Sequence, residues 1–392
     1  MSVWEPNVDG GSTLDLKRSV EARNRRNYRR ESKLWHTPSN DPIPLGCSVC
    51  RDREICGGLK IPQGMFDCLE FCCNNPATCD RVCRANPSFF AKRWREVGGF
   101  NIFDTDRAPS IEHPNLPNFI PIIYHNSRLV EQVDHSAVCL PLYRMFNKRT
   151  GYPRYATREE LCKNFSIGDS SGIVLTGTEE DNRLESWWAL GTEGRRKVIR
   201  ALRDVGVELV TVPNYSLFTD RPRWDDLHAM KRIAITHSEF QQEGVPAALH
   251  VNGRTEKDFE RWAEFVNSRP EVKAVSYEFG TGAGWQRRRN QHIEWLRNFA
   301  ERVQQPLTLY IRGSISSASE LARTFECVRL LDTNVFLKAT YRKKAQRGLN
   351  GKVEWERHST KFEEPIDDIF HHNIRVVEAA LKENMREVLA TD

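Results

Sequence analysis

The densest group of reactive side chains is a run of cysteines near the N-terminus. The chain has 392 residues and 11 cysteines, eight of which are Cys47, Cys50, Cys56, Cys68, Cys72, Cys73, Cys79 and Cys83. A C-x2-C pair lets two thiolates converge on one metal ion, and x3 spacing places two sulfurs one helical turn apart. We therefore predict a structural metal module. Zinc is favoured, and an iron–sulfur cluster is the alternative. If no metal is bound, the cysteines would form a buried cysteine-rich core.

Polar side chains at the ends of apolar runs form a second chemical set. Such residues are costly inside apolar strands unless they are paired or functional. Asp332, within VRLLDTNVF (328–336), is either part of a strand-end ion pair with Arg312 or a carboxylate nucleophile or general base. The catalytic candidates are Asp332, Glu179 and Asp181, and the substrate-binding candidates are Asn214, His250, Asn252, Glu278, Gly280, Gly282 and Arg312.

Two basic segments could contact the phosphates of a nucleic acid. The net charge is only +5, so the prediction rests on where the charge lies. Clustered Lys and Arg side chains gain affinity for phosphates by releasing counterions. The candidates are Arg25, Arg26, Arg29 and Arg30 in an N-terminal arm, and Arg342, Lys343, Lys344 and Arg347 near the C-terminus. For the arm, a solvated helix packed on the exterior of the protein is the alternative.

Eight short apolar runs must position these residues. They are residues 119–125, 137–143, 172–177, 207–215, 246–252, 273–280, 306–313 and 327–336, with charged amphipathic helical stretches between most of them. Continuous apolar strands that alternate with helices indicate a parallel sheet covered on its outer face, and eight repeats match a (β/α)8 TIM-like barrel. An open doubly wound sheet is the alternative. Neither GxGxxG nor GxxxxGK[ST] follows the first run, which counts against a nucleotide-binding open sheet.

The chain divides into four predicted segments. They are a basic N-terminal arm (1–46), a cysteine-rich metal-binding module (47–117), a catalytic (β/α)8-type barrel (118–345), and a basic segment with a C-terminal amphipathic helix (346–392). That helix carries an apolar stripe, predicted to pack as core or as an oligomer contact: Ile366, Ile369, Phe370, Ile374, Val377 and Leu381.

Composition indicates a globular protein without a membrane partner. Hydrophobic residues make up 39% and charged residues 28% of the chain, which argues against general disorder. The mean hydropathy is −0.60, and no apolar run approaches the roughly 20 residues of a membrane helix. The N-terminus, MSVWEPNVDGG, lacks a signal-peptide pattern, so we expect a cytoplasmic location.

Part of the barrel resembles the tRNA-guanine transglycosylase superfamily, in particular its DNA-modifying 7-deazaguanine relatives. LLDTNVFLKATYRKKAQRG (330–348) is similar to that family's final strand, where a nucleophilic aspartate precedes a basic run. EFGTGAG (278–284) resembles its glycine-rich base-recognition loop, and YIRGS (310–314) resembles the strand that follows.

The resemblance implies a base exchange on a nucleic acid. Asp332 would attack C1′ of a nucleoside and hold the sugar covalently while one base leaves and another enters. Asn214, His250 and Asn252 fall where the family reads the base edge. The family's Asp-Ser-Gly-Gly-Phe signature is absent from GIVLTGTEED (172–181), which leaves the acidic residues 179–181 as candidates for the general base.

The leading functional hypothesis is therefore a base-exchanging glycosyltransferase, a pentosyltransferase that inserts a 7-deazaguanine-type base into DNA or RNA. Its expected partners are DNA or tRNA, a small modified purine base, and further copies of the chain or companion modification proteins. A non-catalytic, metal-containing nucleic-acid-binding scaffold is the alternative. A metal-dependent nuclease or hydrolase is less favoured, because the barrel region shows neither an HxH nor an HExxH pair.

Overall fold

The computed structural model describes residues 60–61, 64–65, 87–126, 128–217, 223–280, 286–348, 351–361 and 363–390. All eight cysteines of the predicted metal module, the four arginines of the predicted N-terminal arm, and Gly282 lie outside these residues. The chain forms two compact units, and the larger comprises residues 101–216 and 229–392. In the smaller unit, strand β1 (Lys60–Ile61) pairs antiparallel with β2 (Gly64–Met65), and helix α4 spans Pro87–Glu96.

The larger unit is built on one sheet of eight parallel strands. The strands are β3 (Phe119–Pro121), β4 (Ala137–Pro141), β5 (Gly172–Thr176), β6 (Val207–Thr211), β7 (Ala247–His250), β8 (Ala274–Glu278), β9 (Thr308–Arg312) and β10 (Cys327–Asp332). Their order is β3-β10-β9-β8-β7-β6-β5-β4. An isolated parallel bridge joins Ile122 to Cys139, and the Ile123 N–H donates to the Cys139 carbonyl at 2.9 Å. This bridge brings the two edge strands together, so the sheet is a nearly closed barrel.

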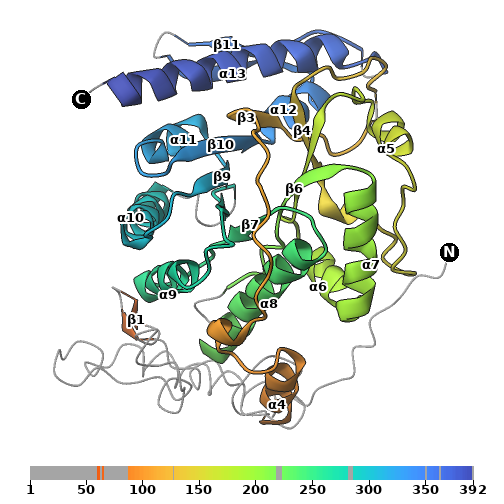
Figure 1. Cartoon of the computed structure of the whole chain (residues 1–392). Helices are drawn as coiled ribbons and strands as arrows, with labels where there is room; N and C mark the ends of the chain where they lie inside the picture. The colour runs from red at the N-terminus through yellow and green to blue at the C-terminus, as the bar shows by residue number, and fades with distance from the viewer. Residues whose placement is uncertain are drawn as a thin grey trace, which may run out of the picture. The chain divides into compact units, whose positions relative to one another are not determined.

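Helices cover the outer face of the sheet (Figure 1). They are α5 (Arg158–Phe165), α6 (Asp181–Trp188), α7 (Gly191–Asp204), α8 (Arg223–Gln242), α9 (Glu256–Asn267), α10 (Gln286–Arg302), α11 (Ile315–Leu321) and α12 (Asn334–Thr340). Each predicted apolar run contains one of the eight strands, so the predicted (β/α)8 architecture is confirmed. No helix in the described parts of the chain is both long and apolar enough to cross a membrane.

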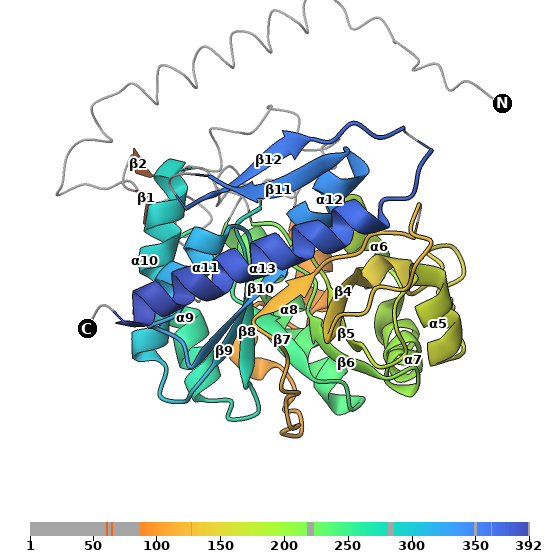
Figure 2. The same cartoon turned by 90° about the horizontal axis from the view of Figure 1, so that it is seen from above.

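The C-terminal helix supplies the cover that the first strand lacks. The described residues between β3 and β4 form no helix, and α13 (Asp367–Ala390) packs on β3, α11 and α12 instead. The carboxylate of Asp367 fixes its start, because Oδ1 accepts the N–H groups of Val130 and Glu131 at 3.0 and 2.8 Å. The six residues of the predicted apolar stripe are all buried, which confirms their packing into the core. A hairpin of β11 (Lys343–Arg347) and β12 (Val353–Arg357) lies along α13 (Figure 2).

The interior of the barrel is a packed core and not a channel. Alternate residues of each strand point inward, because side chains of a strand alternate between the two faces of a sheet. The inward set is Ile120, Ile122, Ala137, Cys139, Val174, Leu209, Ala248, Ala274, Tyr310 and Leu331, and Tyr124 packs on its edge. Polar side chains that continue these inward rows therefore gather where the strands end.

Gly177, the residue after β5, allows β5 and β6 to lie in close contact at that end of the barrel. A Cβ atom at position 177 would lie 2.5 Å from Pro213 N and 2.6 Å from Thr211 O, both of which are backbone atoms. The Gly177 N–H donates to the Thr211 carbonyl at 2.8 Å, which holds the two strands at this separation. Backbone atoms cannot rotate away as a side chain can, so only glycine fits here.

We predict that Gly177→Ala lowers the free energy of unfolding by about 1–3 kcal/mol or more, because the strands must separate to admit the methyl group. Gly168→Ala is a matched control, since its Cβ would meet nothing nearer than Ser171 Oγ at 3.6 Å. Urea unfolding followed by circular dichroism measures both variants. Equal midpoints for the two variants would contradict this account of the strand contact.

Candidate active site at the C-terminal end of the barrel

An ion pair between a buried glutamate and a half-buried arginine lies where β8 and β9 end. Glu278 and Arg312 are partners in the parallel register of these strands, and Arg312 Nη1 lies 3.3 Å from Glu278 Oε2. Arg312 Nη2 also donates to the Tyr124 hydroxyl at 2.7 Å, and Nη1 donates to the Thr178 carbonyl at 3.3 Å. The guanidinium group of Arg312 thus contacts Tyr124 beyond β3, Thr178 beyond β5 and Glu278 at the end of β8. We call Tyr124, Thr178, Glu278 and Arg312 the mouth cluster.

Burial sets the electrostatics of the mouth cluster. The side chain of Glu278 is almost wholly buried, and burial raises the pKa of its carboxyl group against the opposing effects of Arg312 and the Gly280 N–H. Burial lowers the pKa of Arg312, but Glu278 and Tyr124 outweigh this effect, so the net shift is upward. Burial also raises the pKa of Tyr124 to about 12. The cluster therefore combines a fixed positive charge with a carboxyl group that holds its proton more tightly than an ordinary glutamate does.

Gly280 shapes the carboxylate side of the mouth cluster. Its N–H donates to Glu278 Oε1, and a Cβ atom at position 280 would collide with that same oxygen. Gly280, one of the predicted substrate-binding residues, therefore supports the Glu278 carboxyl group directly. Position 282, the other glycine of the predicted loop, lies outside the described residues.

Two of the three candidates for the general base, Glu179 and Asp181, lie in different surroundings. Glu179 is close enough to raise the pKa values of Tyr124 and Arg312, and its Oε2 lies 3.1 Å from Arg183 Nη1. Asp181 is exposed at the start of α6 and accepts the hydroxyl of Ser216 at 2.6 Å. Only Glu179 is therefore electrostatically coupled to the mouth cluster.

The predicted base-reading residues form two further groups. Asn252 Nδ2 donates to Asn214 Oδ1 at 2.6 Å and to the Tyr215 carbonyl at 3.0 Å, so the two asparagines meet beyond β6 and β7. His250 is buried, and its Nδ1 lies 3.1 Å from Ser276 Oγ. Burial lowers the pKa of His250 to about 3, so this ring is neutral at physiological pH.

Asp332 ends β10 but is engaged on the outer side of the barrel wall. Its neighbour Leu331 belongs to the inward set, so the alternation of side chains directs Asp332 toward α12. Oδ1 accepts the Val335 N–H of α12 at 2.8 Å. The ion pair predicted between Asp332 and Arg312 is replaced by the pair of Glu278 and Arg312. Burial raises the pKa of Asp332 to about 6, and the Val335 N–H opposes this shift.

We predict that Asp332→Asn stabilises the protein at neutral and higher pH. The folded-state pKa of about 6 lies above the ordinary value of 3.8. The folded state therefore keeps a proton that the unfolded state has lost, and wild-type stability falls as pH rises from about 4 to about 6. Asparagine can still accept the Val335 N–H but never ionises.

Urea unfolding near pH 4 and near pH 8 tests this prediction, with an expected gain for Asp332→Asn of about 1–3 kcal/mol at the higher pH only. Asp181→Asn, which changes an exposed carboxylate, serves as the control. A gain of the same size at both pH values would show that ionisation of Asp332 is not its cause.

The described residues of the predicted phosphate-binding set are on the flank of the barrel, beside α13. They are Arg342, Lys343, Lys344 and Arg347. Arg342 is buried and donates to the carbonyl groups of Glu364 and Pro365, which precede α13. Arg347 forms an ion pair with Glu383 of α13. Lys343 and Lys344 are half-buried in β11. Arg342 and Arg347 thus fasten the hairpin and the chain to α13.

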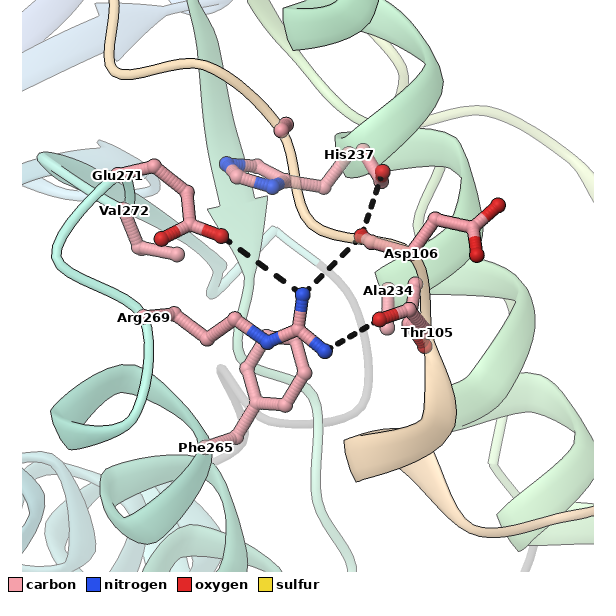
Figure 3. A pocket seen from close by; sticks show the side chains of 10 residues that line it. Thr105, Asp106, Ala234, His237, Phe265, Arg269, Glu271 and Val272 are labelled. Atoms are coloured by element: carbon pink, nitrogen blue, oxygen red, sulfur yellow. Dashed lines mark hydrogen bonds and ion pairs between the residues drawn. The ribbon is translucent and has the colours of Figure 1, made fainter.

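A second polar cluster lies just before the start of β8, at the end of that strand opposite Glu278. Figure 3 shows its side chains from close by. The Arg269 guanidinium donates to the carbonyl groups of residues 103, 105 and 106, and Arg107 pairs with Glu271 through two contacts of 2.7 Å. The cavity between these groups has room for about one water molecule, because the centre of a water molecule can occupy about 10 Å³ of it. This cluster holds segment 103–107 and leaves no space for a substrate.

The described residues contain no group of three or more His, Cys, Asp or Glu side chains that could hold a metal ion. Their three cysteines, Cys139, Cys162 and Cys327, carry free thiols. The predicted zinc or iron–sulfur site falls on the cysteines outside the described part of the chain and stays a prediction.

Tyr124 and Thr178 are the members of the mouth cluster that the sequence analysis missed. Tyr124 lies in the first apolar run (119–125), near its end, and Thr178 follows Gly177 directly. The rule that picked out the other candidates, a polar side chain at the end of an apolar run, also applies to both of them. The sequence carries no signal that Tyr124 bonds to Arg312, which is 188 positions away.

Strand order, packed interior and helical cover define the chain as a (β/α)8-barrel protein. No protein-family model and no curated protein matches it. Among solved structures, dihydrodipicolinate synthase from Agrobacterium tumefaciens str. C58 is similar at 9% identity and a TM-score of 0.34, covering 70% of this chain and 80% of that one. A putative lyase/mutase from Burkholderia cenocepacia J2315 is similar at 13% identity and a TM-score of 0.34, covering 64% and 88%.

Proposed function

We propose that the protein is an enzyme that exchanges the base of a nucleoside within a nucleic acid, at the C-terminal end of its barrel. The observation that carries this proposal is the ion pair of buried Glu278 with half-buried Arg312, which Tyr124 and the Thr178 carbonyl hold in place. Active sites of (β/α)8 barrels lie at this end. Titratable groups with shifted pKa values in such a position are candidates for acid–base chemistry.

A guanine-like base suits the chemistry of this pair. Its amino and imino groups donate hydrogen bonds, and its carbonyl oxygen accepts them. Arginine is the common partner of the guanine carbonyl, and a carboxyl group with a raised pKa can exchange a proton with a ring nitrogen of the base. Glu278 and Arg312 present both functions side by side at the ends of neighbouring strands. The proposed substrates are therefore a 7-deazaguanine-type base and a guanine nucleoside in DNA or RNA.

The reaction would run in two displacements. In the first, a carboxylate oxygen of Asp332 bonds to C1′ while the C1′–N bond breaks, and the leaving base takes the bonding electrons and a proton from Glu278. In the second, the incoming base gives a proton to Glu278, attacks C1′ and displaces Asp332. The raised pKa of Glu278 supports its role as the proton carrier. The target base must leave its stack to reach the barrel.

Asp332 is the member of this scheme that needs the largest rearrangement. Its pKa of about 6 leaves it ionised at neutral pH, as a nucleophile requires. Its Oδ1 must release the Val335 N–H before the carboxylate can turn toward a bound nucleoside. Substitution of Asp332 is therefore a sharper test of the scheme than substitution of the base-binding residues.

We predict that the full-length protein forms a heat-stable covalent adduct with one labelled nucleic acid among duplex DNA, single-stranded DNA and tRNA. Asp332→Asn abolishes the adduct, because an amide cannot act as the nucleophile. Glu278→Gln lowers base exchange by at least about 100-fold, the scale of a lost general acid. Denaturing electrophoresis and incorporation of a radiolabelled base are the measurements.

Asp204→Asn is the control for these variants, since Asp204 is an exposed carboxylate at the end of α7 that pairs with its neighbour Arg203. An adduct that persists in Asp332→Asn but disappears in Glu278→Gln would make Glu278 the nucleophile. No adduct and no exchange with any of the three nucleic acids would overturn the proposal.

The second candidate is a non-catalytic nucleic-acid-binding scaffold. The observation that favours it is the bond from the Val335 N–H to Asp332, which gives this carboxylate a structural task at the start of α12. Under this reading, wild type and Asp332→Asn bind nucleic acid equally in native gels. Neither protein then exchanges a base.

A further inference from the structure

The hairpin of β11 and β12 places two positive charges directly opposite each other. Lys343 and Arg357 are partners in its antiparallel register. The His358 N–H donates to the Arg342 carbonyl at 2.8 Å. The next pair along the hairpin, Lys343 with Arg357, is therefore one without mutual hydrogen bonds, in which side chains lie closer together. Like charges in such a position destabilise a hairpin, and an anion bound between them would offset this repulsion.

A third positive charge lies beside the same face of the hairpin. Side chains two positions apart on a strand share a face, so Trp355 lies next to Arg357. The Lys338 ammonium group of α12 lies 5.8 Å from the centre of the Trp355 ring, which places α12 beside this face. The side chains of Lys338, Lys343 and Arg357 form no ion pair or hydrogen bond with any residue that the structure describes.

The acidic residues of β12 lie on the other face of the hairpin. Glu354 and Glu356 alternate with Trp355 and Arg357 along the strand, so their side chains point to the opposite side. On that side, the register partner of Glu356 is Lys344. These carboxylates therefore do not pair with the cations beside α12.

An exposed aromatic ring stands next to these cations. Tyr341 directly follows α12 and is 71% exposed. Its N–H donates to the Leu337 carbonyl at 3.1 Å, so Tyr341 continues the last turn of the helix. Lys338 lies three positions earlier and is therefore its neighbour on the helix surface. Arg342, in a left-handed conformation with a φ of 55°, then turns the chain into β11, which begins with Lys343.

We propose that Lys338, Tyr341, Lys343 and Arg357 form a binding surface for a single-stranded nucleic acid, which we call the hairpin surface. One base would stack on the Tyr341 ring, and the three cations would contact phosphates. Proteins that bind single strands combine a positively charged surface with exposed aromatic rings in this way. A duplex hides the faces of its bases within the stack, and an acidic peptide brings charge but no base, so the exposed ring favours a single strand over both.

The hairpin surface lies on the flank of the barrel within reach of the mouth cluster. Helix α12 begins at Asn334, two residues after Asp332 ends β10. Because a helix rises about 1.5 Å per residue, Tyr341 lies about 10 Å along the helix axis from its start. A strand whose nucleoside occupies the mouth could therefore continue onto the hairpin surface. This continuation rests on the proposed function, whereas binding of a single strand does not require base exchange.

The stacking contact is tested by fluorescence anisotropy of a labelled oligothymidylate with the full-length protein, over a range of KCl concentrations. We expect Tyr341→Ala to weaken binding by at least about 5-fold with an unchanged logarithmic salt slope, because stacking releases no counterions. Tyr341→Phe should bind as the wild type does, since a phenyl ring also stacks. The control is Tyr152→Ala, which removes an exposed tyrosine between β4 and α5. Equal affinities of Tyr341→Ala and Tyr152→Ala would overturn the hairpin surface.

The charges are tested by Lys343→Gln and Arg357→Gln in the same assay. Each should weaken binding by about 3- to 10-fold and reduce the logarithmic salt slope by about 0.7, the loss of one phosphate contact. The control is Lys148→Gln, which removes an exposed charge between β4 and α5 and should leave affinity and slope as in the wild type. Salt slopes that match the control in both hairpin variants would overturn the assignment of these cations to phosphates.

The class of ligand is tested by comparing three labelled probes with wild type and Tyr341→Ala. The probes are the single strand, a duplex of the same length, and poly-glutamate. The variant should lose affinity for the single strand only. An equal loss for the duplex would overturn the preference for unpaired bases, and an equal loss for poly-glutamate would make the hairpin surface a site for an acidic peptide.

Base exchange distinguishes failure of the hairpin surface from failure of the proposed function. If both are correct, Tyr341→Ala raises KM for the nucleic acid, whereas Glu278→Gln lowers kcat. If the wild type exchanges no base but its binding of a single strand depends on Tyr341, the hairpin surface stands and the proposed function falls. Exchange with a KM that Tyr341→Ala leaves unchanged would overturn the hairpin surface alone. Matching thermal transitions of the variants and the wild type verify that all are folded.

Discussion

The ion pair between Glu278 and Arg312 is the interaction on which the arrangement of the mouth depends. Glu278 is buried and Arg312 is half-buried, so removal of Arg312 would leave the Glu278 carboxylate buried without compensation. The pair forms because β8 and β9 are parallel neighbours in a register that makes their final residues partners. Tyr124 and the Thr178 carbonyl then accept hydrogen bonds from Nη2 and Nη1 of Arg312, and they come from two other strand ends.

Closure of the barrel makes this convergence possible. Tyr124 follows β3 and Thr178 follows β5, and β3 lies at one edge of the strand order while β4, next to β5, lies at the other. The bridge from Ile122 to Cys139 joins these edges. The buried apolar stripe of α13 covers the barrel wall beside β3, where the described residues that follow the strand form no helix. A segment at the far end of the chain thus stabilises the strand that delivers Tyr124.

The two ends of the barrel use charged groups differently. At the strand starts, Arg269 and Glu271 are occupied with the backbone of segment 103–107 and with Arg107. At the strand ends, Arg312 and Glu278 form an ion pair with each other. A polar ligand could form hydrogen bonds with either side chain in place of this pair. This difference, together with the raised pKa of Glu278, is why the candidate active site lies at the strand ends. The conclusion agrees with the general location of active sites in barrels of this class.

Local sequence determined the strands, most of the helices and the places where polar side chains follow the strands. Apolar runs and helical periodicity are short-range patterns, so each of the eight runs contains a strand and Glu278 and Arg312 could be singled out from sequence. Only the tertiary structure decided which carboxylate meets Arg312. Asp332 and Glu278 both end apolar strands, but alternation directs Asp332 to α12, whereas register places Glu278 beside Arg312. The bond from Arg312 to Tyr124 spans 188 positions and depends on barrel closure, which no local pattern encodes.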